Sequence, residues 1–214
     1  MKLSLSLIET NTEIRQKILL AMQSLIDKAL DNTIQNLSKN IKNLLIEALK
    51  SEPEYSSLIS GELRREFGIS DTSNVNIAIE NIASSIKINK KAIKINNTGL
   101  SGGIEINIIN NQDYGGALSD YSGQVIDKDR GYSLPWLEWL LLRGNQIIVK
   151  NYEVKLGENS RSRSGDAIMI SSSSNWRVPP KFAGTMQDNW TTRALSTIEN
   201  QLTNLIRSTF EKNI

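Results

Sequence analysis

Four aspartates fall in one polar stretch between residues 110 and 132: Asp113, Asp120, Asp127 and Asp129. Carboxylates of this kind bind Ca²⁺, and a pair of them can act as acid and base in the hydrolysis of glycosides. The spacing does not match an EF-hand loop, and a mixture of Gly, Asp and Ser is typical of exposed turns. We therefore expect a loop here, with Asp120 and Asp127 as the pair to test for hydrolytic chemistry.

Two tryptophans, Trp136 and Trp139, stand one helical turn apart in "LPWLEWLLL". Exposed aromatic rings can form a platform for sugars, and buried ones fill a core or a subunit contact. Together with Asp120 and Asp127 they define the alternative hypothesis, a tail-associated carbohydrate-binding or hydrolytic protein. Packing or a subunit contact is the interpretation that we favour.

Two arginines, Arg161 and Arg163, lie in the loop "RSRSG". A phosphate-binding Walker loop requires a lysine after its second glycine, and this loop has none. The pattern is typical of a solvated loop between strands. If it has a function, the guanidinium groups would contact DNA phosphates or an acidic face of a neighbouring subunit.

The composition argues against catalysis. The 214 residues include no cysteine and no histidine, and the net charge is +2. Disulfides, thiolate metal sites and a cysteine nucleophile are excluded, and the usual general base and commonest metal ligand are missing. We therefore predict no catalytic, cofactor-binding or metal-binding residues. The small net charge does not require a nucleic-acid or membrane partner.

The remaining sequence predicts the elements that position these residues. Period-two leucines over residues 1–11 indicate a short strand or arm, and the N-terminus does not resemble a secretory signal. Apolar residues at steps of three and four predict one helix over 12–50, capped by Thr12, about 50 Å long at 1.5 Å per residue. Such a helix either supports an assembly or packs along its own sheet. No apolar run is long enough to span a membrane.

Alternation of apolar and polar residues predicts four strands, at about 86–96, 102–110, 145–157 and 166–176. A short helix is expected over 133–144, capped by Ser133 and closed by Gly144, and a final helix capped by Asp188 or Asn189. The predicted fold class is α+β: an antiparallel sheet of about four strands with the long N-terminal helix and the C-terminal helix packed on it. We expect a single domain over 1–214, with its sheet-plus-helix core in 84–214.

The stretch "NWRVPPKFAGTMQDNWTTRAL" connects the last strand to the last helix. Pro179 and Pro180 restrict the backbone, and they do so in the unfolded chain as well. Trp176, Phe182 and Trp190 provide apolar anchors along it. The pattern indicates a device that fixes the orientation of the last helix.

These residues carry a resemblance. "LPWLEWLLLRGNQIIVKNYEV", "AIMI" and "WRVPPKFAGTMQDNWTTRAL" resemble structural proteins of tailed phages, particularly contractile-tailed marine phages. The plan is similar to neck and tail-completion proteins, in which a connector bearing Phe, Gly and Thr leads to a C-terminal helix, as Phe182, Gly184 and Thr185 do here. "SGELRREFGI" matches their "TG-LR" segment at Gly61 and Leu63-Arg64, but lacks the threonine.

The resemblance implies a neck, tail-completion or tail-terminator subunit without catalysis. Family members form hexameric or dodecameric rings around a channel through which DNA passes without sequence-specific binding. Expected partners are copies of the chain and other neck, portal or tail proteins, and the expected location is the head–tail junction of the virion, after assembly in the host cytoplasm. We expect the loops 110–132 and 157–165 to face the channel or the next ring.

Subunit contacts are expected from the long N-terminal helix and the 176–190 connector. The candidate interface residues share either an aromatic ring or a guanidinium group: Trp136, Trp139, Trp176, Phe182, Trp190, Arg161 and Arg163. A third hypothesis is an adaptor protein that uses the long helix as a zipper. The β-rich second half argues against it.

Overall fold

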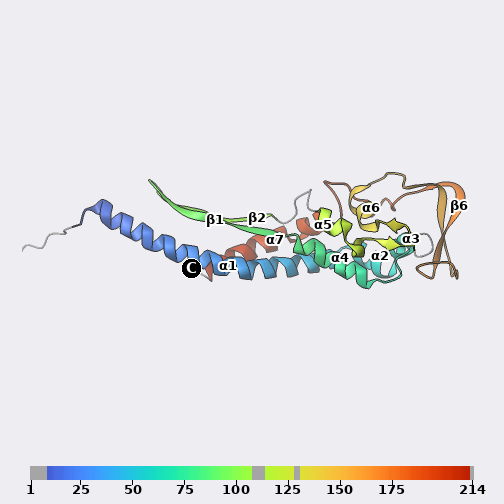
Figure 1. Ribbon diagram of the computed structural model, residues 1–214, viewed down its shortest axis with the longest axis horizontal. Coiled ribbons are helices and arrows are strands. Elements are labelled where there is room, and N and C mark those ends of the chain that lie inside the picture. The colour runs from blue at the N-terminus through green and yellow to red at the C-terminus, as the bar shows by residue number, and fades with distance from the viewer. Residues whose placement is uncertain (1–8, 108–113, 128–130, 213–214) are drawn as a thin grey trace, which may run out of the picture. The chain divides into compact units, whose positions relative to one another are not determined.

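The computed structural model describes residues 9–107, 114–127 and 131–212 (Figure 1). The chain forms two compact units. Unit 1 comprises residues 1–40, 87–107 and 203–214, and unit 2 comprises 41–86 and 108–202. The single domain expected over 1–214 stays a prediction, since the first and last helices each contribute residues to both units. The expected N-terminal strand or arm lies mostly outside the described residues.

The fold class is α+β, with the long helix near the N-terminus and the last helix near the C-terminus that the sequence predicts. The helices are α1 (Asn11–Ser51), α2 (Pro53–Ser60), α3 (Glu62–Phe67), α4 (Ser73–Ser84), α5 (Tyr114–Ser119), η1 (Tyr121–Gly123), α6 (Trp136–Leu142) and α7 (Trp190–Glu211). The strands are β1 (Lys87–Asn96), β2 (Gly99–Asn107), β3 (Val125–Ile126), β4 (Ser133–Leu134), β5 (Val149–Leu156) and β6 (Ala167–Trp176).

The prediction of one four-stranded sheet is wrong. Among the described residues, the strands form separate antiparallel pairs, β1 with β2, β3 with β4 and β5 with β6. The four long strands lie close to the predicted segments, but each pairs only with its neighbour in sequence. Alternation with a period of two predicts where a strand lies, but it does not predict whether two hairpins pair edge to edge into one sheet. The hairpin β1–β2 belongs to unit 1 and the hairpin β5–β6 to unit 2.

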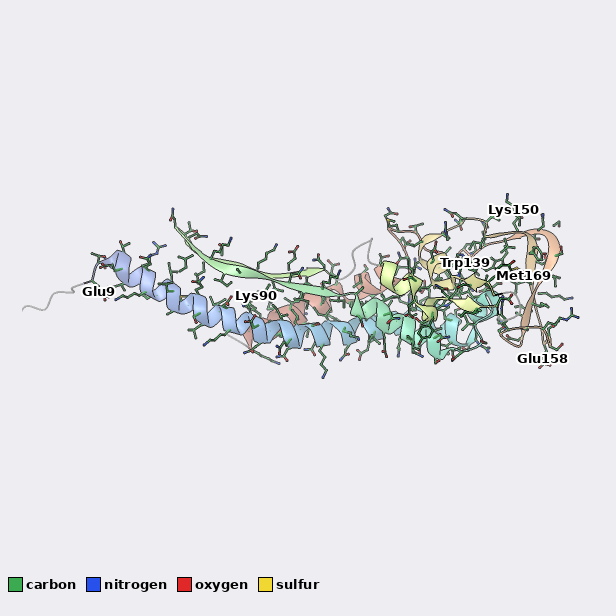
Figure 2. All side chains as sticks on the ribbon, viewed as in Figure 1. Glu9, Lys90, Trp139, Lys150, Glu158 and Met169 are labelled. Carbon is green, nitrogen blue, oxygen red and sulfur yellow. The ribbon has the colours of Figure 1, made fainter. Side chains whose placement is uncertain are left out.

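Unit 1 is built on the first part of α1, with β1–β2 alongside it (Figure 1). Gln23 donates a side-chain hydrogen bond of 2.6 Å to the carbonyl of Ile93. Lys90 forms ion pairs of 3.0 and 2.8 Å with Asp27 and Asp31, and Figure 2 shows Lys90 between the hairpin and the helix. Leu30 and Ile93 are buried. The hairpin therefore covers one face of α1.

The first turn of α1 is capped by Thr10 rather than by Thr12. The Thr10 hydroxyl accepts a hydrogen bond of 3.3 Å from the Glu13 amide, and the Thr10 amide donates one of 2.7 Å to the Glu13 carboxylate. This reciprocal arrangement is the capping box. It also lowers the pKa of Glu13, because the carboxylate accepts hydrogen bonds from the Thr10 backbone and hydroxyl.

Unit 2 contains a hydrophobic core that spans several short helices. Helix α1 ends at Ser51, just before Pro53, which lacks an N–H and begins α2. Gly68 ends α3 in the left-handed conformation, with its amide bonded to the Arg65 carbonyl. The largest fully buried side chains of this core are Trp136, Trp190, Phe67, Leu45, Leu49, Leu58, Leu63, Ile79 and Ile82.

The predicted cap of the 133–144 helix is also corrected. Helix α6 begins at Trp136 with Pro135 at the N-cap position, and no side chain caps it. Ser133 instead lies in β4, paired with Ile126. Gly144 follows the helix with a φ of 52°, in the region that favours glycine.

Candidate interaction surfaces

The connector predicted to orient the last helix is held by backbone hydrogen bonds to α6. The amide of Gly184 donates to the carbonyl of Leu140 at 2.9 Å, and the amide of Gly144 donates to the carbonyl of Gly184 at 2.8 Å. A Cβ at position 184 would lie 2.7 Å from the Leu140 oxygen and 2.6 Å from the Cβ of Asn189. Only glycine fits there, so the backbones of the connector and α6 are in direct contact.

Asn189 caps α7, as the sequence predicts. Its side-chain oxygen accepts hydrogen bonds from the amides of Thr191 and Thr192 at 3.0 and 3.1 Å. Its side-chain nitrogen donates to the carbonyl of Thr185 at 2.7 Å. One buried side chain thus satisfies the helix N-terminus and closes the turn of the connector. The connector fixes where α7 begins.

Three of the five predicted aromatic residues meet in one cluster with Phe67. Phe67 lies between Trp136, Trp139 and Trp176, with ring centroids 6.2, 6.4 and 6.1 Å away. Trp139 and Trp176 form an edge contact at 5.6 Å. Such tilted and edge geometries are the favourable ones for aromatic pairs. The cluster joins α3, α6 and the end of β6 within unit 2.

The polar edges of these rings have partners within unit 2. The indole N–H of Trp136 donates to the carbonyl of Ser122 at 3.1 Å. The indole N–H of Trp176 donates to a carboxylate oxygen of Glu66 at 2.5 Å. Burial raises the pKa of Glu66, and the hydrogen bond from Trp176 opposes that rise only in part. Glu66 was not singled out from the sequence, because no pattern marks a carboxylate that will face an indole far along the chain.

Trp136, Trp176, Phe182 and Trp190 are buried in unit 2, so in this structure they are core side chains and not surface anchors. Trp139 is half-buried. The sequence names these aromatic residues as interface candidates, and the structure places most of them in the interior of unit 2.

The two loop arginines differ from each other. Arg161 is exposed, and its backbone amide bonds to the Asn159 side chain. Arg163 forms an ion pair of 3.2 Å with Asp127 and lies against Gly68 at the end of α3. Both arginines are exposed, and Arg163 in addition ties the 157–165 loop to other parts of unit 2.

The aspartates of the alternative hypothesis have structural partners. Asp120 caps η1, accepting hydrogen bonds from the amide and hydroxyl of Ser122 at 2.9 and 2.5 Å. These bonds lower the pKa of Asp120, the hydroxyl bond most of all. A general acid requires the opposite shift. Asp127 pairs with Arg163. Asp113 and Asp129 lie outside the described residues.

Arg64 and the β5–β6 loop line an open pocket of about 630 Å³ in unit 2. Arg64 donates a hydrogen bond of 3.1 Å to the carbonyl of Ser164 at its wall. Glu158 and Asp166 also line the pocket, and their carboxylates carry the charge opposite to that of Arg64. Neither Asp120 nor Asp127 lines it. Within the described parts of the chain, no group of three or more Asp, Glu, His or Cys residues is arranged to hold a metal ion.

Large apolar side chains are exposed on both units. The first part of α1 exposes Ile18, Leu20, Met22 and Leu25, each at 45% or more of its full surface. Unit 2 exposes a second set, in which Tyr121, Ile126 and Tyr132 are each exposed by 59% or more. The sequence indicated an amphipathic helix, but could not tell which apolar positions the hairpin would leave uncovered. Among described helices, none is long and apolar enough to cross a membrane.

Comparison of the chain with protein-family models, with curated proteins and with solved structures found no match in any of the three. The functional conclusion therefore depends on the residues and surfaces described above.

Proposed function

We propose that the protein is a structural subunit of a tailed-phage particle that forms a ring at the head–tail junction, as a neck, tail-completion or tail-terminator protein. The observation that carries the proposal is the presence of two separate sets of exposed large apolar side chains, one in each unit. A ring subunit needs two different contact surfaces, because a head-to-tail interface closes into a ring only if each copy presents both.

The interior of unit 2 supports the same proposal. Its polar groups serve packing: Trp136, Trp176 and Trp190 each donate a hydrogen bond to a group within the subunit. The connector between β6 and α7 is fixed by Gly184 and Asn189. A rigid subunit loses little conformational entropy when it assembles, so more of the contact energy stabilises the ring.

The location in the particle is tested by labelling. Antibodies raised against the purified chain would be applied to phage particles that carry it, with gold-tagged secondary antibody and electron microscopy. The proposal expects gold at the junction between head and tail. Labelling along the tail fibres or of the capsid surface, with an unlabelled junction, would contradict it. Particles of an unrelated phage provide the control for non-specific binding.

A further inference from the structure

Three of the four large exposed apolar side chains of α1 form a stripe, and the fourth, Leu20, lies on another face of the helix. Ile18, Met22 and Leu25 are exposed by 54%, 45% and 68%. They follow each other at steps of four and three residues, so they lie on one face of the helix. This spacing is that of a helix packed against a partner. We refer to these three residues as the α1 stripe.

The hairpin occupies a different face of α1. Lys90 of β1 pairs with Asp27 and Asp31, so the acidic residues of this part of the helix are already neutralised. The α1 stripe keeps basic residues at its two ends. Arg15 lies three residues before Ile18 and Lys28 three residues after Leu25, and both are exposed. One nitrogen of Arg15 also donates a hydrogen bond of 3.2 Å to the carbonyl of Asn97 in the hairpin turn. The free face is thus apolar with a positive charge at each end.

The charge of the two units is opposite. Unit 1 contains eleven basic and six acidic residues, a net charge of +5, whereas unit 2 contains fourteen basic and seventeen acidic residues, a net charge of −3. The imbalance in unit 2 arises in residues 41–86, which carry four basic and seven acidic residues. A basic apolar surface on one copy therefore has an acidic counterpart on another.

Helix α4 and η1 contribute one large exposed apolar side chain and two carboxylates to unit 2. Tyr121 is exposed by 59%. Asp120 precedes it, and Glu80 is exposed on α4. The two elements are joined by a hydrogen bond of 3.4 Å from Asn81 to Ser122. The pKa of Asp120 is lowered, first by its hydrogen bond from the Ser122 hydroxyl, which keeps it charged. We refer to Glu80, Asp120 and Tyr121 as the α4–η1 patch.

Other exposed apolar residues of unit 2 have less suitable surroundings. Ile126 is followed by Asp127, whose carboxylate already pairs with Arg163. Tyr152 and Leu156 stand on β5, whose charged residues are two lysines, Lys150 and Lys155, and one carboxylate, Glu153, so the strand as a whole is basic. The carboxylate of Glu80, in contrast, makes no salt bridge to any residue in the described ranges.

We propose that the α1 stripe of one copy docks on the α4–η1 patch of a second copy, giving a head-to-tail contact; this inference rests on the ring function proposed above and specifies its interface. Arg15 and Lys28 face the carboxylates of Glu80 and Asp120, and Tyr121 packs against the stripe. Contact between two α1 stripes is disfavoured. An antiparallel pair centred on Met22 places Arg15 within one residue of Lys28, and a parallel pair places Arg15 opposite Arg15.

The absence of cysteine from the chain allows a direct test. Full-length Met22→Cys and Tyr121→Cys variants are mixed with a short bismaleimide cross-linker at low ionic strength. A matched control mixes Met22→Cys with Ser174→Cys, because Ser174 is an exposed residue of unit 2 on β6. We expect the 22–121 pair to cross-link at least about tenfold faster than the 22–174 pair, since complementary charge raises encounter rates by tenfold or more. Circular dichroism verifies that each variant is folded.

A charge reversal distinguishes a specific contact at the α4–η1 patch from nonspecific electrostatic attraction between unit 1 of one copy and unit 2 of another. Glu80→Lys in the Tyr121→Cys chain is expected to slow cross-linking severalfold. Glu47→Lys makes the same charge change at another exposed position of unit 2 and is expected to leave the rate nearly unchanged. Equal rates for the 22–121 and 22–174 pairs, equal effects of the two reversals, or fastest cross-linking of Met22→Cys with itself would each overturn the proposal.

The result is distinguishable from failure of the ring function. Fast 22–121 cross-linking with open filaments in electron micrographs leaves the contact standing and removes the closed ring. Closed rings without a preferred 22–121 cross-link leave the ring function standing and overturn this contact.

Discussion

Trp190 replaces a hydrogen bond that proline removes from the end of the long helix. In a regular helix the carbonyl of Leu49 would accept from the amide of residue 53, but that residue is Pro53 and has no N–H. The indole N–H of Trp190 donates to the Leu49 carbonyl at 3.0 Å instead. Both groups are fully buried. The first residue of α7 is thereby joined to the end of α1 within unit 2.

Replacement of Trp190 by phenylalanine tests this relationship. The Trp190→Phe variant leaves the Leu49 carbonyl buried without its donor, so we expect the free energy of unfolding to fall by about 1–3 kcal/mol. Urea unfolding followed by circular dichroism measures it. The Met186→Ala variant is the control, since that exposed side chain should change stability by less than about 0.5 kcal/mol. A Trp190→Phe variant as stable as the wild type would show that the indole N–H contributes nothing.

Arg193 neutralises a buried carboxylate. Glu54 is 1% exposed, and one of its oxygens lies 2.5 Å from an Arg193 nitrogen. Removing the Arg193 cation leaves the buried Glu54 carboxylate without a counter-charge. Arg193→Ala is therefore expected to lower the free energy of unfolding by about 3–5 kcal/mol. Asp188 pairs with the same guanidinium but is 75% exposed, so Asp188→Asn should cost no more than about 1 kcal/mol. Similar losses for the two variants in chemical denaturation would refute this ranking.

The pH dependence of stability tests the Glu66–Trp176 pair. Because burial raises the pKa of Glu66 in the folded protein, the folded state binds this proton more tightly than the unfolded state. The contribution of Glu66 to stability therefore falls as pH rises from its ordinary pKa through the raised one. We expect the stability of Glu66→Gln relative to wild type to increase over that window. A difference that stays constant with pH, or decreases, would contradict the assignment.

Two neighbouring glycines of β2 provide a matched pair. Gly102 and Gly103 have φ values of 150° and 147°, so alanine is strained at both. A Cβ at Gly102 would also lie 2.8 Å from the Ala92 carbonyl oxygen, at the bulge of β1, whereas no atom of the described residues lies within 4 Å of one at Gly103. Gly102→Ala should therefore melt at a lower temperature than Gly103→Ala. Thermal unfolding compares them, and the reverse order would be evidence against the described hairpin register.

The sequence predicts well those features that depend on neighbouring residues. The long helix, the strands β1 and β2 and the Asn189 cap all follow from spacing or from a local preference for one residue type. Thr10 and Glu13 also carried the capping-box spacing, and placing the cap at Thr12 missed it.

Features that depend on distant residues were not predictable in this way. The pairing of strands across hairpins, the partner of Glu66 and the donor to the Leu49 carbonyl each join segments far apart in the chain. The burial of Trp136 and Trp190 likewise depends on which helices pack around them. The α1 stripe became recognisable only when the hairpin was seen to cover another face of the helix.

The central claim, a ring-forming subunit, is tested most directly by light scattering of the purified protein behind a sizing column, combined with negative-stain imaging of each peak. The account predicts a species of six or twelve subunits of 23.9 kDa, imaged as closed rings with an open channel. A species with the mass of one subunit at every concentration and ionic strength, or a closed twofold dimer, would contradict it.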